Sequence, residues 1–203
     1  MKVMLASMCA GLVMVVLGMA VTASPAPDKD QLLIAAAERN DVESVRRLLR
    51  DGAGVQARDA QGRTGLMAAT YRNHVEVARV LIDAGSDVNA QDAMQNSPLL
   101  LAGASGYLDI VRMTLAARPD FTVYNRFGGT ALIPACERGH VEVVKALLKT
   151  TIDVNHVNRL GWTALLEAIL LSDGGTAHQE IVRLLLAAGA NPNLADHDGV
   201  TPL

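Results

Sequence analysis

The stretch GRTGL at residues 62–66 returns at a fixed spacing along the chain, and this repetition decides the fold. Related stretches follow 33 residues apart at 95–99 (QNSPL), 128–132 (GGTAL) and 161–165 (GWTAL), and GVTPL at 199–203 comes 38 residues later. A second segment repeats too, since NHVEV at 73–77 returns as GHVEV at 139–143. Self-similarity with a period of roughly 20–50 residues is typical of stacked repeat proteins.

Each period carries the start and stop signals of two helices. The residues expected to cap the first helices with a side-chain oxygen are Thr64, Ser97, Thr130 and Thr163. Pro98 and Pro202 occupy the first helical position, where a missing N–H costs nothing. The second helices end at Gly52, Gly85 and Gly189, which suit a left-handed C-cap.

Two departures from the repeat predict local irregularities. Arg118 stands where other units have glycine, and Pro119 after it favours an extended backbone at Arg118. We therefore expect a nonstandard connector after the third unit. Five additional residues lie between Leu165 and His178, and their Gly and Asp content predicts a surface loop between the two helices of the fifth unit.

These motifs resemble the ankyrin repeat, whose pattern runs Gly-x-Thr-Pro-Leu, a Gly-His turn, an aliphatic second helix and Gly-Ala-Asp-Val-Asn-Ala. The resemblance covers about residues 28–203 and implies an all-α ankyrin-repeat solenoid of helix-turn-helix units with β-hairpin fingers. After a short linker at 24–30, we expect units near 31–58, 59–91, 92–125, 126–158 and 159–195, and a truncated sixth at 196–203. We also expect the natural chain to continue past Leu203 or this sequence to be a truncation, because a polar capping unit is missing.

The N-terminus predicts export. Met1 and Lys2 precede an apolar run at 3–21, and small residues follow up to Ala23, which is the pattern of a signal peptide cleaved after residue 23. The alternative is an uncleaved membrane anchor, because the run approaches the length of a membrane span. The predicted location is periplasmic or secreted. Cys136 then remains as a lone cysteine, which excludes an intramolecular disulfide.

Composition and motifs argue against catalysis and nucleic-acid binding. The formal net charge of −3 lacks the basic excess typical of nucleic-acid binding domains. His74, His140 and His178 match the Gly-His turn of the resembled family, where the ring bonds to backbone, and no zinc-ligand set or phosphate loop accompanies them. Cys136 falls at a small-residue helix position and is expected to be a buried hydrophobe. We expect no enzyme, no cofactor and no metal.

The resemblance implies recognition of a protein through the fingers and first helices, which line a concave face. The candidate contact residues at these positions are Arg63, Tyr71, Arg72, Met94, Tyr124, Arg126, Phe127, Arg138, Arg159, Leu160 and Trp162. Met94, Phe127 and Leu160 share one finger position at 33-residue spacing and are expected to form an exposed apolar ridge. The alternative is that the finger apolars pack on neighbouring fingers and the arginines are merely solvated. Glu167 is expected either to pair with an arginine on this face or to be solvated.

The predicted function is a non-catalytic, monomeric protein-binding module that is exported and contacts neither nucleic acid nor, once the signal is cleaved, a membrane. Phe127 and Trp162 are expected to anchor a partner with an acidic surface, and Arg126 and Arg159 to make polar contacts, because aromatic and arginine side chains dominate interface energetics. The chain also resembles bacterial periplasmic ankyrin proteins, some of them linked to catalase function and peroxide defence. Alternatives are a secreted effector that binds host proteins and an accessory subunit of an enzyme.

Overall fold

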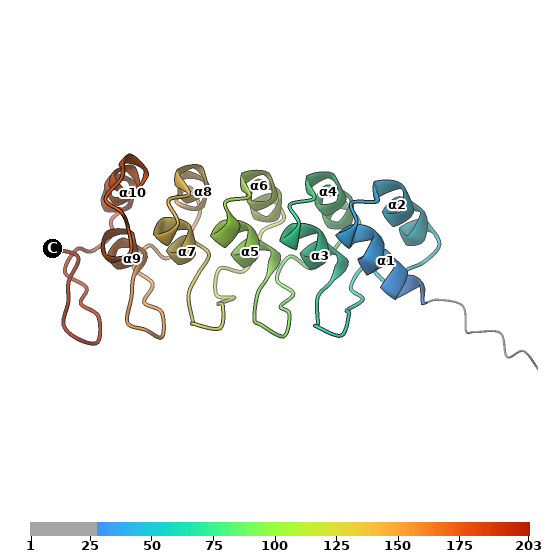
Figure 1. Ribbon diagram of the computed structural model, residues 1–203, viewed down its shortest axis with the longest axis horizontal. Coiled ribbons are helices and arrows are strands. Elements are labelled where there is room, and N and C mark those ends of the chain that lie inside the picture. The colour runs from blue at the N-terminus through green and yellow to red at the C-terminus, as the bar shows by residue number, and fades with distance from the viewer. Residues whose placement is uncertain (1–27) are drawn as a thin grey trace, which may run out of the picture.

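The computed structural model describes residues 28–203; the expected signal peptide falls in residues 1–27, outside the described part. Within residues 28–203 the chain forms ten α-helices and no strand. The helices stand in five pairs that follow one another along the long axis of the molecule, in sequence order (Figure 1). The predicted all-α solenoid is confirmed. No helix in the described part is long and apolar enough to span a bilayer.

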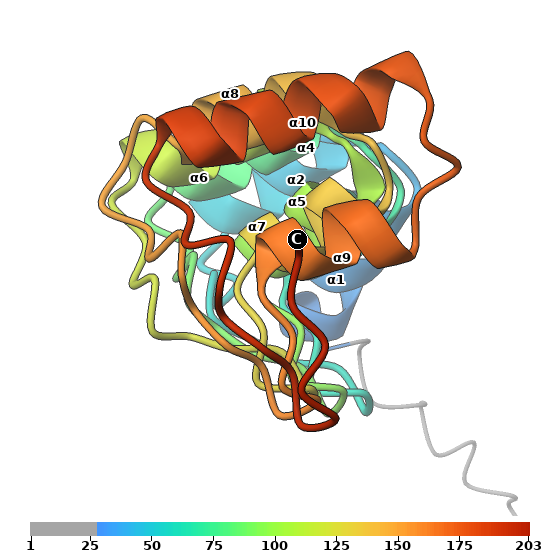
Figure 2. The same ribbon diagram turned by 90° about the vertical axis from the view of Figure 1, so that its left-hand side faces the viewer.

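Each pair, called a unit from here on, contributes one helix to each of two layers (Figure 2). The first helices are α1 (Lys29–Glu38), α3 (Gly65–Tyr71), α5 (Pro98–Ser105), α7 (Leu132–Glu137) and α9 (Ala164–Leu170). The second helices are α2 (Val42–Arg50), α4 (Val75–Asp83), α6 (Leu108–Ala116), α8 (Val141–Leu147) and α10 (Thr176–Ala187). Loops between units, here called fingers, project together on one side of the first-helix layer (Figure 2).

The core is built from aliphatic side chains and alanine. One alanine recurs every 33 residues in the first helices and is buried in all five units: Ala36, Ala69, Ala102, Ala135 and Ala168. A methyl side chain lets successive first helices pack closely, and leucine and isoleucine from both layers fill the remaining space. No aromatic side chain of the described residues is fully buried; Tyr107 and Phe121 pack against the edge of the core, and Tyr71, Tyr124 and Phe127 are exposed.

Three of the four predicted caps are present. Thr64, Ser97 and Thr163 accept hydrogen bonds at 3.1–3.3 Å from the backbone N–H three residues later. The prediction for Thr130 is wrong, because α7 begins only at Leu132 and the buried Thr130 Oγ1 has no partner within the described chain.

Pro134 explains the missing cap. In the second unit the N–H of Ala68 donates to the carbonyl of Thr64 at 2.9 Å, which closes the first turn behind the cap. Pro134 holds the same place relative to Thr130 and has no N–H to donate. The first turn of α7 therefore stays open, and the N–H groups that Thr130 would cap are not brought to it.

The connector after the third unit follows the repeat more closely than its sequence predicts. Arg118 is left-handed, with φ of 56°, like Gly85 at 88°, so the expected extended conformation is wrong. Its N–H donates to the Leu115 carbonyl at 3.1 Å, as that of Gly85 does to Ile82 at 2.9 Å. The next unit can stack only if the chain reverses here, and this requirement overrides the local preference. Compared with the connector at Gly85, this one makes one backbone hydrogen bond fewer, because Pro119 has no N–H to donate.

Two smaller predictions concern the loop of the fifth unit and a helix start at Pro202. The additional residues of the fifth unit form the expected loop, at 171–175 between α9 and α10. No helix begins at Pro202 in the described chain.

Histidines link successive units through the backbone, as predicted. The Nε2 atoms of His74 and His140 lie 3.0 and 3.2 Å from the carbonyl oxygens of Glu38 and Ala104, at the ends of the preceding first helices. His178 Nε2 makes the same contact with Glu137 at 3.0 Å. Each contact satisfies a carbonyl that the helix end leaves free.

Candidate protein-binding surface

Each finger is folded around one Asp or Asn side chain that accepts two backbone N–H groups. These residues are Asp59, Asp92, Asn125, Asn158 and Asp196. In the fourth finger, Asn158 Oδ1 accepts from the N–H groups of Leu160 at 2.9 Å and Trp162 at 3.0 Å. The same residue also makes two backbone hydrogen bonds across each turn, through its N–H and its carbonyl, so every finger takes the same shape without forming a strand.

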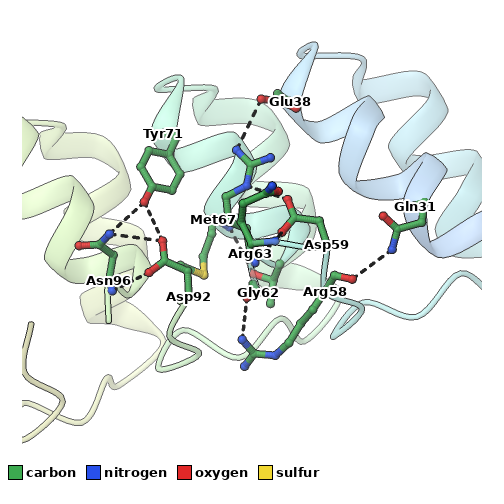
Figure 3. Close-up of polar contacts among 12 residues, drawn as sticks. Gln31, Glu38, Arg58, Asp59, Gly62, Arg63, Met67, Tyr71, Asp92 and Asn96 are labelled. Carbon is green, nitrogen blue, oxygen red and sulfur yellow. Dashed lines mark hydrogen bonds and ion pairs between the residues drawn. The ribbon is translucent and has the colours of Figure 1, made fainter. Parts of the chain in front are cut away.

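A ladder of side chains ties neighbouring fingers together. Gln31 Nε2 donates to the carbonyl of Arg58, Arg58 Nη1 to that of Gln91, and Gln91 Nε2 to that of Tyr124, at 2.6–3.0 Å. Figure 3 shows the contact between Gln31 and Arg58 at the start of this ladder. Tyr124 in turn stacks on the ring of His156, with 4.5 Å between centroids. The fingers therefore stand at fixed spacing before any partner binds.

The apolar ridge is exposed. Met94, Phe127 and Leu160 lie one residue before the tip glycine or its equivalent and keep 49, 46 and 53% of their surface accessible. The polar hydrogen bonds of the finger hold the backbone, so none of these side chains is needed to bury the core. Their apolar surface is available to a partner.

At the N-terminal end, the candidate residues are already occupied by contacts within the chain (Figure 3). Arg63 Nε lies 2.7 Å from Asp59 Oδ2, and its Nη1 lies 3.5 Å from Glu38 Oε1. Tyr71 donates its hydroxyl to Asp92 Oδ2 at 2.7 Å. Burial of the ring, helped by this carboxylate, raises the pKa of Tyr71 to about 12. Arg63 and Tyr71 thus link neighbouring units.

Arg72 takes part in the same cluster more loosely. Its Nη2 lies 3.7 Å from Glu38 Oε1, and its side chain is largely exposed. Glu38 therefore faces both Arg72 and Arg63. The positive charge that the sequence places on this part of the surface is largely balanced by carboxylates of the chain itself.

The C-terminal end contains a groove of about 430 Å³ between the third and fifth units. It is lined by residues of α5, α7 and α9 and by the fingers before α7 and α9. Five of the eleven candidate residues line it: Arg126, Phe127, Arg138, Leu160 and Trp162. The other six, Arg63, Tyr71, Arg72, Met94, Tyr124 and Arg159, lie outside its lining. From here on this hollow is called the groove.

Arginines in and beside the groove are held mainly by a ring or by backbone carbonyls, and only Arg138 also lies near a carboxylate. The Arg126 guanidinium carbon lies 4.8 Å from the centroid of the Phe127 ring. Arg159 Nη1 donates to the Arg126 carbonyl at 3.1 Å, and Arg138 Nη1 donates to that of Ala104 at 2.8 Å. Only Arg138 approaches a carboxylate, that of Glu137 at 4.0 Å. In contrast to Arg63, these cations retain the capacity to meet an acidic group.

Glu167 contradicts both sequence predictions. It is neither solvated nor ion-paired with an arginine, but 6% exposed, and its Oε1 accepts from Asn158 Nδ2 at 3.1 Å. Burial, with a smaller contribution from the Glu137 carboxylate, raises its pKa to about 7. The sequence did hold a signal of burial, because the equivalent repeat positions carry Ala68, Leu101 and Pro134.

The described residues contain no cluster of metal ligands, and their cysteine is buried. No group of three or more His, Cys, Asp or Glu within residues 28–203 could hold a metal ion. Cys136 is fully buried, as predicted, and burial raises the pKa of its thiol far above the usual range. A thiol in this state is a poor nucleophile.

Comparison with known proteins gives one consistent picture. A family model described as ankyrin repeats in three copies matches residues 3–92, 32–125 and 99–196. The crystal structure of an ankyrin repeat domain from Acinetobacter baumannii AYE is similar, with a TM-score of 0.82 and 56% identity over 84% of this chain and 87% of that one. The ankyrin repeat protein EF0377 gives a TM-score of 0.83 and 40% identity over 85% and 88%. An ankyrin repeat protein of Escherichia coli K12, YahD, is 60% identical over 37 residues, which is 18% of either protein.

Proposed function

The chain belongs to the ankyrin repeat family, and we propose that it is a non-catalytic module that holds a protein partner in the groove of its third to fifth units. One observation carries the proposal. Phe127, Leu160 and Trp162 line a hollow of about 430 Å³, and the stack does not need their exposed surface for its own core. Aromatic side chains beside a hollow are the usual anchors of a protein interface.

The shape of the groove is set before binding. Asn125 and Asn158 fix the two fingers that carry Phe127 and Trp162, and the N–H of Arg159 donates to the carbonyl of Phe127 at 2.8 Å across the fingers. A partner therefore has few backbone groups to order, and association loses less conformational entropy than it would on a flexible loop. This favours recognition by shape, with little movement of the backbone.

The charge at the edge of the groove supports a partner that presents acidic groups there. Arg126 and Arg138 line the groove and Arg159 lies just outside its lining. A ring or carbonyl oxygens hold these three, and only Arg138 has a carboxylate nearby, at 4.0 Å, whereas Arg63 and Arg72 both face Glu38. The acidic contacts of the partner are therefore proposed at the C-terminal units. Because such rim contacts weaken with salt, affinity should fall as ionic strength rises.

The experiment is capture of partners from a periplasmic extract on the immobilised protein, with Phe127→Ala, Arg159→Ala and Trp162→Ala as variants. Leu186→Ala is the matched control, because this exposed apolar residue of α10 does not line the groove. We expect the same proteins to be retained by the wild type and the control, and at least tenfold less by the Phe127 and Trp162 variants. Thermal unfolding of every variant is measured alongside.

Unchanged capture by the Phe127 and Trp162 variants would overturn the proposal. If these variants also lost thermal stability, the residues would be assigned to folding alone. If an isolated partner were converted chemically in the presence of the protein, the non-catalytic part of the proposal would be wrong.

Export to the periplasm, with a contribution to peroxide defence, completes the proposal. It is supported by the N-terminal sequence and by the resemblance on which the sequence prediction rests. Cell fractionation should recover a chain that begins at Ser24 in the periplasm, and deletion of the gene should increase sensitivity to peroxide. Recovery in the culture medium would instead favour a secreted effector.

A further inference from the structure

The floor of the groove is acidic, although its rim is basic. Glu167 of α9 and Glu137 of α7 both line the hollow. Glu167 is 94% buried from solvent, as its 6% exposure implies, and Glu137 is partly exposed. The other units place an aliphatic residue or proline at the position of Glu167, so the stack does not require a carboxyl group there.

Half of the Glu167 carboxyl group has no partner. Oε1 accepts from Asn158 Nδ2 at 3.1 Å, whereas Oε2 has neither a hydrogen bond nor an ion pair with any residue from 28 to 203. Asn158 Oδ1 accepts from the N–H groups of Leu160 and Trp162, and its Nδ2 donates to Glu167 through Oε1 alone. Oε2 is not sealed from solvent, since Ser86 Oγ and Thr130 Oγ1 are the only buried side-chain nitrogen or oxygen atoms of residues 28–203 without a partner, so a donor group that enters the groove can reach it.

The charged groups around Glu167 within residues 28–203 do not form an ion pair with its carboxyl group. Glu137, the last residue of α7, is a second carboxylate. Arg138, the next residue, directs Nη1 to the Ala104 carbonyl at 2.8 Å and has Nε 4.0 Å from Glu137 Oε2. Cys136, on the same helix, is a buried thiol. On α10, which also packs against α9, His178 is engaged by Asp173 and by the carbonyl of Glu137. Arg138 also lines the groove, but no cation of residues 28–203 forms an ion pair with Glu167, so a second cation can be accommodated there.

The walls of the groove suit a long side chain with a charged end. Phe127, Leu160 and Trp162 line it together with Leu101 and Pro134. Lysine and arginine carry an aliphatic stem that packs on apolar surface and a head that donates several hydrogen bonds. Aromatic rings next to such a head add a favourable interaction with the cation.

We propose that the groove takes one lysine or arginine side chain of the protein partner, with its stem against Phe127 and Trp162 and its cationic head at Glu167 and Glu137. This inference rests on the proposed function and names the chemistry that the groove selects. The partner would then present a basic side chain to the floor of the groove and acidic groups to its rim. Because one site requires both a basic side chain and acidic groups, it excludes partners whose contact surface carries charge of one sign only.

Binding should respond to pH in a definite direction. Because the pKa of Glu167 lies at about 7, the carboxylate is about one-tenth populated at pH 6 and about nine-tenths populated at pH 8. The cation binds the ionised form, so its affinity should rise about tenfold between these two pH values. Lysine and arginine themselves stay protonated throughout this range.

The test uses the purified, ¹⁵N-labelled protein and the peptide acetyl-Gly-Arg-Gly-amide, with the citrulline peptide as its neutral isostere. Lysine replaces arginine in a third arm. NMR shifts of the Trp162 indole N–H and the Asn158 side-chain amide report on the groove. Glu167→Gln is the test variant, because its amide oxygen can still accept from Asn158, and exposed Glu43→Gln on α2 is the matched control.

We expect saturable shifts with a basic peptide, binding at least tenfold weaker with citrulline or in the Glu167 variant, and no change in the Glu43 variant. The inference is overturned if citrulline binds equally well, if the Glu167 variant keeps its affinity, or if affinity does not rise from pH 6 to pH 8. Should partner capture still depend on Phe127 in that case, the proposed function would stand and only this inference would fail.

Discussion

Replacing the capping residues by valine tests whether Pro134 disables the cap of the fourth unit. Thr163 caps α9 through a 3.1 Å bond from the N–H of Leu166, whereas the buried Thr130 Oγ1 has no partner. Valine has nearly the shape of threonine and cannot accept a hydrogen bond. Thr163→Val should therefore lower the free energy of unfolding by about 1 kcal/mol, the usual contribution of a cap. Thr130→Val should leave it unchanged or raise it by up to about 1 kcal/mol, because it removes an unsatisfied buried hydroxyl.

The same reasoning predicts the effect of Pro134→Ala. Its new N–H can donate to the Thr130 carbonyl, as Ala68 does to Thr64, and bring the cap into place. Two hydrogen bonds of about 1 kcal/mol each are gained. Against this, alanine gives the unfolded chain more freedom than proline, which costs about 0.4–1 kcal/mol. The net gain should be about 1 kcal/mol, and in this background Thr130→Val should become as costly as Thr163→Val.

Urea unfolding followed by circular dichroism measures all of these variants, and equal m-values show that the same surface is exposed in each. The double-mutant cycle of Thr130 and Pro134 should give a coupling energy of about 1–2 kcal/mol. The reasoning is refuted if Thr130→Val costs as much as Thr163→Val in the wild type. It is also refuted if the two changes in the fourth unit are additive.

Three further predictions concern other contacts. Arg118→Gly should stabilise the protein by about 1 kcal/mol and Gly85→Ala destabilise it by a similar amount, because both positions are left-handed; thermal unfolding measures both. His140→Ala should cost about 1–3 kcal/mol in urea unfolding because it frees the Ala104 carbonyl, while exposed His197→Ala, with no such bond, should cost little. Relative to Glu167→Gln, the wild type should lose about 3 kcal/mol of stability as pH rises from about 4.5 to about 7. The Glu167 carboxyl group keeps its proton over this range in the folded protein, whereas it releases the proton in the unfolded chain. Urea unfolding of both proteins across the range measures this, and a constant difference in the free energy of unfolding between wild type and variant would contradict the prediction.

The sequence predicted the stack because each of its signals acts within one unit or between neighbours. The 33-residue spacing, three of the four caps and the left-handed glycines were all readable, since a repeat protein needs only local turns and nearest-neighbour packing. Where two local signals competed, the prediction failed. Pro134 removed a cap at Thr130, and stacking imposed a left-handed backbone on Arg118 in spite of Pro119.

The sequence predicted which positions lie on the candidate surface, but it did not predict which of these residues come together in one binding site. The repeat register placed eleven residues on one face, but it could not show that Arg63 and Tyr71 are engaged by Asp59 and Asp92. Nor could it show which residues line one hollow. Those facts depend on how far each side chain reaches toward the next finger, and that distance is set by the stacking of units.

The sequence by itself thus determined the architecture, the spacing of the fingers and the exposure of the ridge at Met94, Phe127 and Leu160. Only the tertiary structure decided where the groove lies and that Glu167 is buried at its floor with one oxygen unpartnered. The physical reason is that repetition specifies backbone geometry, which every unit shares. Desolvation and charge balance depend on side chains from three successive units that meet only when the stack is assembled.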